Sequence, residues 1–216
     1  MKIASIQVGQ PQTYQVPDID GKLHKWRTAI FKTPVDGPRW AGRLGLEGDG
    51  QADKRFHGGS DKAINAYCFE HYAHWTAELG LDAMPFGAFG ENFTVFGALE
   101  ADVCIGDIFE VGEAVVQISQ PRQPCGTLAR RWNTPSLVKR IEDHGSSGWY
   151  FRVLTEGNVL AGDAFKRVER PFPKWTVALA NDVMHHRRTD YAASHELAAL
   201  PPLATSWKEA LNRRGR

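Results

Sequence analysis

The chain has 216 residues, and its 26 Lys and Arg residues nearly balance its 25 Asp and Glu residues, giving a net charge of +1. This balance disfavours a dominant nucleic-acid or membrane-binding surface, and the length suits one domain or one domain with a small appendage. The three cysteines form neither a disulfide framework nor a zinc pattern. With no signal peptide and no long apolar run, the sequence predicts a cytoplasmic protein that does not enter a membrane.

In the first two-thirds of the chain, short apolar runs alternate with glycine-bearing turns, which is typical of a strand-rich domain. In chain order we predict strands at residues 1–8, 23–32, 63–69, 93–95, 107–111, 114–119 and 148–154. A turn at Asp20–Gly21 precedes the second strand. Short helices are expected at residues 71–79 and 137–144.

The pattern becomes alanine-rich and helical after residues 171–173, which read Pro-Phe-Pro. Three helices are predicted at residues 176–186, 190–200 and 205–213, with Thr176, Asp190 and Thr205 as N-caps. We therefore predict a mainly β, α+β chain with a barrel-like domain over residues 1–170 and a helical appendix over residues 171–216. The basic end from Lys208 is interpreted as a solvated tail rather than a polyanion site.

Cys125 is the residue that points most directly to chemistry. It lies in the segment Ser-Gln-Pro-Arg-Gln-Pro-Cys-Gly, residues 119–126, directly after a predicted strand. Two prolines restrict the backbone before the thiol, and Gly126 leaves space after it. The positive charge of Arg122 favours the thiolate, the form that attacks electrophiles and binds soft metals. The segment therefore predicts either an activated nucleophile or a metal ligand.

A polar, glycine-dense loop over residues 45–59 is a second candidate. Lys54, Arg55 and His57 suit phosphate or another anion, and glycines such as Gly58 and Gly59 let the main chain approach a ligand closely. An ordinary surface loop with turn glycines is the alternative reading and stays open. The loop contains no Walker or dinucleotide-binding pattern, which disfavours nucleoside triphosphates.

Asn92 and Arg152 are further candidates for binding. Asn92 lies in a glycine-bracketed turn, and its amide can both donate to and accept from the edge of a heterocycle; a turn asparagine is the alternative. Arg152 follows an aromatic run and, if it points inward, needs an anionic partner, because buried arginine is almost always paired.

The remaining cysteines and four of the histidines are predicted to be structural. The two cysteines fall in apolar runs and are predicted to be buried. Two of the histidines lie three residues apart on a predicted helix without an HExxH motif or a carboxylate partner, and the other two lie near a predicted helix end, where a cation is mildly favourable. These residues are Cys68, Cys104, His71, His74, His185 and His186.

Several short motifs in order resemble the MOSC domain family, named for the C-terminal domain of molybdenum cofactor sulfurases, and within it the bacterial YiiM-like proteins. The motifs are Gly-Leu-Glu-Gly-Asp (45–49), His-Gly-Gly (57–59), Phe-Gly-Glu-Asn (89–92), Gly-Asp (106–107), the Cys125 segment (119–125), Gly-Trp (148–149) and Gly-Asp (162–163). The likeness covers nearly the whole chain.

This resemblance implies a closed β-barrel like the small inserted domain of pyruvate kinase, followed by a three-helix C-terminal domain. It also implies a molybdenum cofactor, with Cys125 as the protein ligand of the metal. The phosphate of the pterin would be held by the loop of Lys54, Arg55, His57, Gly58 and Gly59, and the pterin or the oxygen ligands of the metal by Asn92, Arg122 and Arg152. Pyridoxal phosphate is not expected, because no lysine stands in a recognisable Schiff-base context.

The activity implied by the resemblance is reduction of N-hydroxylated bases such as 6-hydroxylaminopurine. The chain carries no flavin, haem or iron–sulfur motif, so a separate electron-donor reductase is expected as a partner. The alternative is a non-redox carrier that receives sulfur or passes cofactor through Cys125. A third reading makes the helical tail a nucleic-acid or partner module, and the basic end of the chain is the feature that suggests it. A homodimer is also possible.

Overall fold

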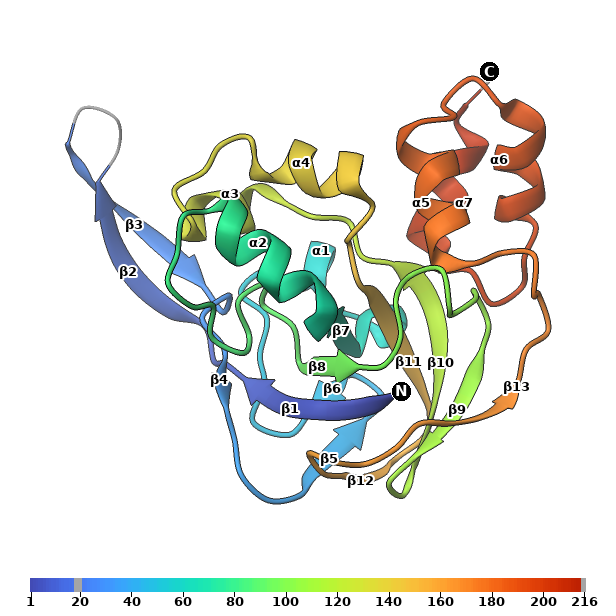
Figure 1. Ribbon diagram of the computed structural model, residues 1–216, viewed down its shortest axis with the longest axis horizontal. Coiled ribbons are helices and arrows are strands. Elements are labelled where there is room, and N and C mark those ends of the chain that lie inside the picture. Colours follow the sequence, from blue (N-terminus) through green and yellow to red (C-terminus); the bar gives the residue numbers. More distant parts are fainter. Residues whose placement is uncertain (18–20, 215–216) are drawn as a thin grey trace.

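In the computed structural model, which describes residues 1–17 and 21–214, the centre of the molecule is an eight-stranded sheet (Figure 1). The strand order is β13-β9-β10-β11-β7-β8-β1-β4, and neighbours are antiparallel except for the parallel pair β7 and β8. The strands are β1 (Lys2–Val8), β4 (Thr33–Pro34), β7 (Ile64–Cys68), β8 (Phe93–Phe96), β9 (Ile108–Val111), β10 (Ala114–Pro121), β11 (Trp149–Thr155) and β13 (Lys166–Glu169).

The sheet curls into an open half-barrel, so the closed barrel expected from the resemblance is not what the described strands form. Its edges are short: β4 has two residues, one of them a proline, and all four residues of β13 are exposed. Short or proline-bearing strands continue a hydrogen-bonded ladder poorly. Residues 1–3 and the segment before β13 meet only locally, through the bridge of Lys2 with Ala164 and backbone hydrogen bonds such as that from the N–H of Ile3 to the carbonyl oxygen of Asp163 at 2.9 Å.

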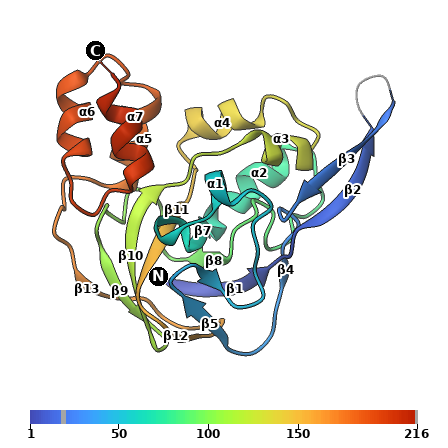
Figure 2. The same ribbon diagram turned by 180° about the vertical axis from the view of Figure 1, so that it is seen from behind.

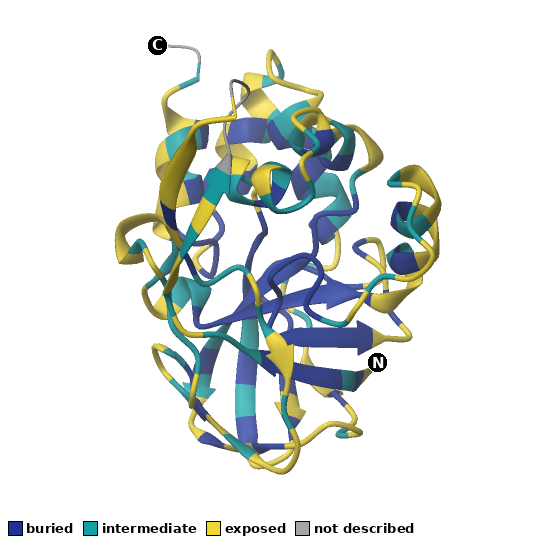
Figure 3. Cartoon of the chain, turned by 90° about the vertical axis from the view of Figure 1, so that its left-hand side faces the viewer, coloured by how far each residue is buried: buried dark blue, intermediate teal, exposed yellow. Residues whose placement is uncertain are grey.

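The concave side of the sheet and the C-terminal helices share one hydrophobic core. Inward residues alternate along the strands, and the buried stretches appear as dark blue ribbon in Figure 3. Phe109, Phe151 and Phe165 pack together here, the last two as stacked rings 5.6 Å apart. This core positions the end of β10, from which the Cys125 segment leaves the sheet.

A second core lies under the helices that cover one end of the sheet (Figure 1). Its helices are η2 (Phe69–His71), α2 (Tyr72–Glu78), α3 (Gly126–Arg131) and α4 (Leu137–His144). Trp75, Leu128 and Ile141 are buried there, and Tyr67 stacks on Phe89 at 3.9 Å between ring centroids. The predicted helices at 71–79 and 137–144 are confirmed.

The C-terminal appendix consists of α5 (Val177–His185), α6 (Tyr191–Ala198) and α7 (Thr205–Asn212). Thr176 and Asp190 cap α5 and α6 by accepting from the backbone N–H groups of Leu179 and Ala193, as predicted. The predicted cap at Thr205 is wrong, because α7 already begins there after Ala204.

The sequence indicated that the basic tail is solvated. The structure shows that it is not wholly so. Arg214 donates to the carbonyl oxygens of Val183 and Met184 at 2.8 and 2.5 Å, near the C-terminal end of α5, where a cation is favoured. The last tail residue of the prediction, Arg216, lies outside the described residues.

The remaining elements are small. A three-stranded sheet has the order β12-β5-β6, and β2 and β3 form a separate antiparallel ribbon. Most of these elements were not predicted, and the turn expected at Asp20–Gly21 falls partly outside the described residues. Their bounds are β2 (Gln12–Pro17), β3 (Leu23–Thr28), β5 (Arg39–Gly42), β6 (Gly45–Leu46), α1 (Lys54–His57), η1 (Ser60–Lys62) and β12 (Gly157–Val159).

Candidate active site

A cavity of about 260 Å³ lies beside Cys125. Its wall combines the segment after β3, the loop that leads into α1, part of β7 and the turn from β10 into α3, so residues far apart in sequence meet there. In Figure 2, α1 lies between the α3–α4 segment and the sheet. The ionisable wall residues are mainly basic: Arg27, Lys32, His57, Lys62 and Arg122 face Asp49 and Asp53. The cavity therefore suits an anionic ligand.

Cys125 is partly exposed on this wall, at the N-terminal boundary of α3. Burial disfavours its thiolate, but a hydrogen bond from His57, the charges of Arg122 and His57, and the backbone N–H of Thr127 outweigh burial and lower its pKa to about 6. The predicted influence of Arg122 is present. The larger favourable contribution comes from His57, which the sequence had indicated only as an anion ligand.

Arg122 is buried, with 4% of its surface exposed, and it lines the cavity. Its Nη2 donates to the carbonyl oxygen of Phe89 at 2.6 Å. Its Nη1 is buried without a hydrogen-bond partner among the described residues. An unpaired buried guanidinium nitrogen is costly, so this atom is a donor suited to an oxygen of a bound anion.

The loop that holds Arg122 is itself fixed by Glu91, whose side chain is fully buried. The Glu91 carboxylate accepts from the backbone N–H groups of Gly87 and Phe89 at 2.8 and 2.9 Å, and also from the hydroxyl groups of Tyr72 and Thr94. The Phe89 carbonyl oxygen then receives Arg122. Glu91 thus orients a basic group through the backbone of its own turn.

Asn92 lines the cavity, but its amide is engaged by the backbone. Its Oδ1 accepts from the N–H of Asn65 at 3.1 Å, and its Nδ2 donates to the carbonyl oxygen of Gln7 at 3.3 Å. The neighbouring Asn65, which the sequence did not single out, also lines the cavity, and its Oδ1 has no partner in the described part of the chain. Asn65 is therefore the amide with a free acceptor.

Two lysines in the cavity wall were also missed. Lys32 is buried and forms an ion pair with Asp49, with Nζ and Oδ2 2.5 Å apart; burial lowers its pKa, while Asp49 opposes that shift. Lys62 donates to the carbonyl oxygen of Phe56 at 2.6 Å. Neither lysine lies within a recognisable motif, so only the packing reveals that both line the cavity.

Several predicted site residues lie outside this cavity. Lys54 lines an adjacent groove of about 820 Å³ that shares Arg27, Asp49, Gly50 and Gln51 with the cavity. Arg55 is exposed and bonded to Asp53. Neither Gly58 nor Gly59 contributes to the wall.

Arg152 also lies outside the cavity, where it ties the sheet to the C-terminal helices. Its guanidinium donates to Asp61 Oδ1 at 2.6 and 3.0 Å, to Gln117 Oε1 at 2.8 Å and to the carbonyl oxygen of Pro202 at 3.1 Å. It has the anionic partner that the sequence required, but that partner is a protein carboxylate rather than a cofactor.

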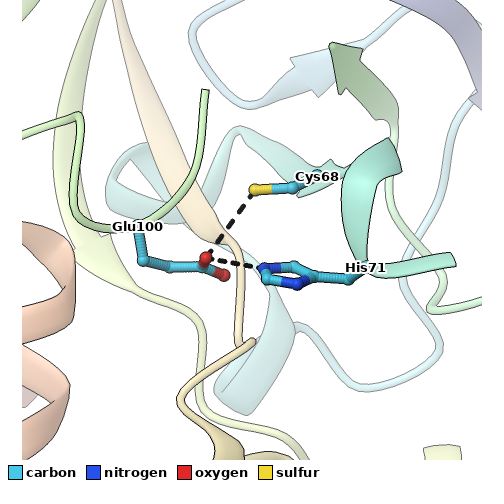
Figure 4. Close-up of side chains that lie close together, drawn as sticks. All are labelled: Cys68, His71 and Glu100. Atoms are coloured by element: carbon cyan, nitrogen blue, oxygen red, sulfur yellow. Dashed lines mark hydrogen bonds and ion pairs between the residues drawn. The ribbon is translucent and has the colours of Figure 1, made fainter. Parts of the chain in front are cut away.

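A separate group of possible metal ligands consists of Cys68, His71 and Glu100 (Figure 4). The predicted burial of Cys68 and Cys104 is confirmed. The expectation that His71 lacks a carboxylate partner is wrong, because its Nε2 lies 2.8 Å from Oε2 of Glu100, 29 residues further along the chain. Cys68 Sγ lies 3.8 Å from the same oxygen.

The comparison with known proteins agrees with these motifs. The model of the MOSC domain matches residues 53–166, and the model of the YiiM-like, 3-alpha helix domain matches residues 175–214. The chain belongs to the MOSC domain family.

Relatives match nearly the full length of the chain. The uncharacterized protein YflK of Bacillus subtilis is 40% identical over 95% of this chain and 90% of its own length, and protein YiiM of Escherichia coli is 36% identical over 93% and 92%. A protein of Gibberella moniliformis named "Reductase" is 37% identical over 81% of this chain but only 31% of its own length. The crystal structure of YiiM from Geobacillus stearothermophilus superposes with a TM-score of 0.82, 40% identity and coverage of 99% and 98%.

Among the residues that the structure describes, no helix combines the length and apolar character needed to cross a bilayer.

Proposed function

We propose that this protein is a molybdenum-cofactor-dependent reductase of N-hydroxylated compounds such as 6-hydroxylaminopurine. The observation that carries the proposal is the pairing of Cys125, with a pKa of about 6, with the unpaired buried Nη1 of Arg122 in one cationic cavity. A thiolate is a suitable soft ligand for molybdenum, and an unpaired guanidinium nitrogen suits an anionic oxygen. The name of the fungal relative supports a redox role.

The residues present fit such a cofactor. Cys125 would bind the metal, Arg122 would donate to its oxygen ligands, and Asn65 Oδ1 would accept from an N–H group of the pterin. Arg27 and Lys54 line the adjacent groove, which shares part of its wall with the cavity, and they would hold the phosphate. When bound, the cofactor would supply a two-electron centre able to take up an oxygen atom.

The N–O bond of the hydroxylamine breaks, two electrons and two protons are consumed, and the products are the amine and water. Because the chain has no redox motif of its own, the electrons come from a separate reductase, which remains part of the proposal. His57 keeps Cys125 in the thiolate form, and Lys62 adds positive charge to the wall that receives substrate.

The test is reconstitution with molybdenum cofactor, comparing the unmodified protein with Cys125→Ser and with Cys104→Ser as a control, since the Cys104 thiol is buried near the Pro173 carbonyl and outside the cavity. We expect metal retention, thiolate-to-molybdenum charge-transfer absorption and turnover with an artificial electron donor in all but Cys125→Ser. Identical spectra and molybdenum content in the three proteins would reject ligation by Cys125.

Binding without turnover in the unmodified protein would instead favour the carrier function. The partial exposure of the Cys125 thiolate is compatible with persulfide transfer, so this outcome has a specific structural basis.

A further inference from the structure

We propose that Cys68, His71 and Glu100 form a binding site for a zinc ion, separate from the cavity of Cys125 and independent of the reductase proposal. Their ligand atoms all lie within 4.8 Å of one another (Figure 4). Thiolate, imidazole and carboxylate are the three donor types that zinc sites in proteins use. None of the three residues lines the Cys125 cavity.

Two of the side chains approach one carboxylate oxygen of the third. Both His71 Nε2 and Cys68 Sγ approach Oε2 of Glu100, at 2.8 and 3.8 Å. In a tetrahedral zinc site, bond lengths of about 2.0–2.3 Å place neighbouring ligand atoms about 3.3–3.6 Å apart. The two spacings to Glu100 differ from this by about half an ångström or less. The third pair, Cys68 Sγ and the His71 ring nitrogen, lies within 4.8 Å and has to close by up to about 1.3 Å, which side-chain rotation of His71 and Cys68 would supply.

The backbone fixes the carboxylate in the orientation that a ligand needs. Glu100 is buried, with 4% of its surface exposed, and its Oε1 accepts from the N–H of Gly148 at 2.8 Å. Outer contacts of this kind orient metal ligands, and this one turns Oε2 toward His71 and Cys68. Gly148 can make this contact because it has a φ of +69° and lies against the carbonyl oxygen of Ala66, where a side chain would not fit.

The surroundings leave room for a fourth ligand. His71 and Glu100 line an open cavity of about 350 Å³ between the end of α4 and α5, so water or a small ligand can reach the metal. Binding replaces the proton of the Cys68 thiol, and that proton leaves to solvent. The carbonyl oxygen of Glu100 accepts from the N–H of Ala178 in α5, so the ion would also brace the contact between sheet and appendix.

The test uses the three cysteines of the full chain. In a Cys104→Ser/Cys125→Ser variant, Cys68 is the one remaining thiol and the proposed site is untouched. We expect this variant to take up one equivalent of zinc, and with cobalt to develop thiolate-to-metal charge-transfer absorption. A folded variant that binds no zinc, or cobalt without that absorption, overturns the proposal.

Glu100→Gln in the same background is the second arm. The amide oxygen can still accept from Gly148, but the anionic ligand is lost. Loss of an outer contact alone weakens metal sites about 10- to 100-fold, so loss of this ligand is expected to weaken zinc binding by more than about 100-fold. Equal zinc affinity with and without the substitution would show that the metal binds elsewhere.

Discussion

The acidity of Cys125 depends on His57, and substitution of this histidine tests how the candidate site works. His57→Ala removes both the hydrogen bond and the charge that lower the pKa of the thiol. His57 lies on α1, none of whose residues is buried, so the change leaves the core intact. What remains is burial, which raises the pKa, opposed by Arg122 and the N–H of Thr127.

The size of the expected pKa change follows from the ordinary and the lowered pKa of the Cys125 thiol. The thiol pKa falls from 9.0 to about 6, although burial acts in the opposite direction. At pH 7 a pKa of about 6 leaves about nine-tenths of Cys125 as thiolate, and a rise of about two units would leave about one-tenth. We expect the pKa to rise by at least about one unit, because the largest favourable contribution is lost.

The assay is the pH dependence of alkylation by iodoacetamide, followed at Cys125 by mass spectrometry. The midpoint of the pH profile is the useful quantity, because a thiolate of higher pKa is also a stronger nucleophile and partly offsets its lower population. The rate should fall as the pH drops through about 6 in the unmodified protein and at a higher pH in His57→Ala. His74→Ala, an exposed histidine outside the cavity, is the matched control. A midpoint in His57→Ala equal to that of the control would refute the reasoning.

Three further substitutions test the framework. Arg152→Ala should lower the free energy of unfolding by about 1–3 kcal/mol in urea denaturation, because it removes charge-assisted bonds and leaves their acceptors unpaired; an unchanged value would contradict its bridging role. Glu91→Leu should cost at least about 2 kcal/mol, since two buried backbone N–H groups lose their acceptor, and thermal melting would reveal it. Gly148→Ala should destabilise more than Gly145→Ala: both have positive φ, worth about 1–3 kcal/mol, but only at the first would a Cβ lie 2.3 Å from a carbonyl oxygen. Equal melting temperatures for the two would argue against that steric conflict.

Short sequence patterns predicted those helices and strands whose contacts are made between residues close together in the chain. The hairpin of β9 and β10 combines alternating apolar residues with a Gly112-Glu113 turn, and both features are legible in the sequence. The ribbon of β2 and β3 was half missed because β2 carries only two large apolar side chains, Tyr14 and Val16, between polar residues. Its aromatic contacts, such as Tyr14 with Phe31 at 4.8 Å, form between residues that no short window connects.

The candidate site likewise contains residues that short motifs revealed and residues that only the packing revealed. Cys125, Arg122 and His57 were found because they belong to short motifs that carry recognisable chemistry. Asn65 was not, since the sequence could not tell which of two buried asparagines would be used by the backbone. The partner of His71 was missed because Glu100 reaches it only through the packing of a distant loop.

The short helix α1, which carries His57, is only weakly anchored to the rest of the molecule. Its single turn is held at one end by Asp53, which accepts from the N–H of Arg55, and no core contact anchors it. Elements with so few buried contacts open locally at low free energy, and the thiolate of Cys125 is stabilised by a residue on this turn. An anion that contacts both His57 and Arg122 would hold the turn closed. Amide hydrogen exchange over residues 54–58 should therefore slow when the cavity is occupied, while exchange in β7 and β10 stays as slow as before.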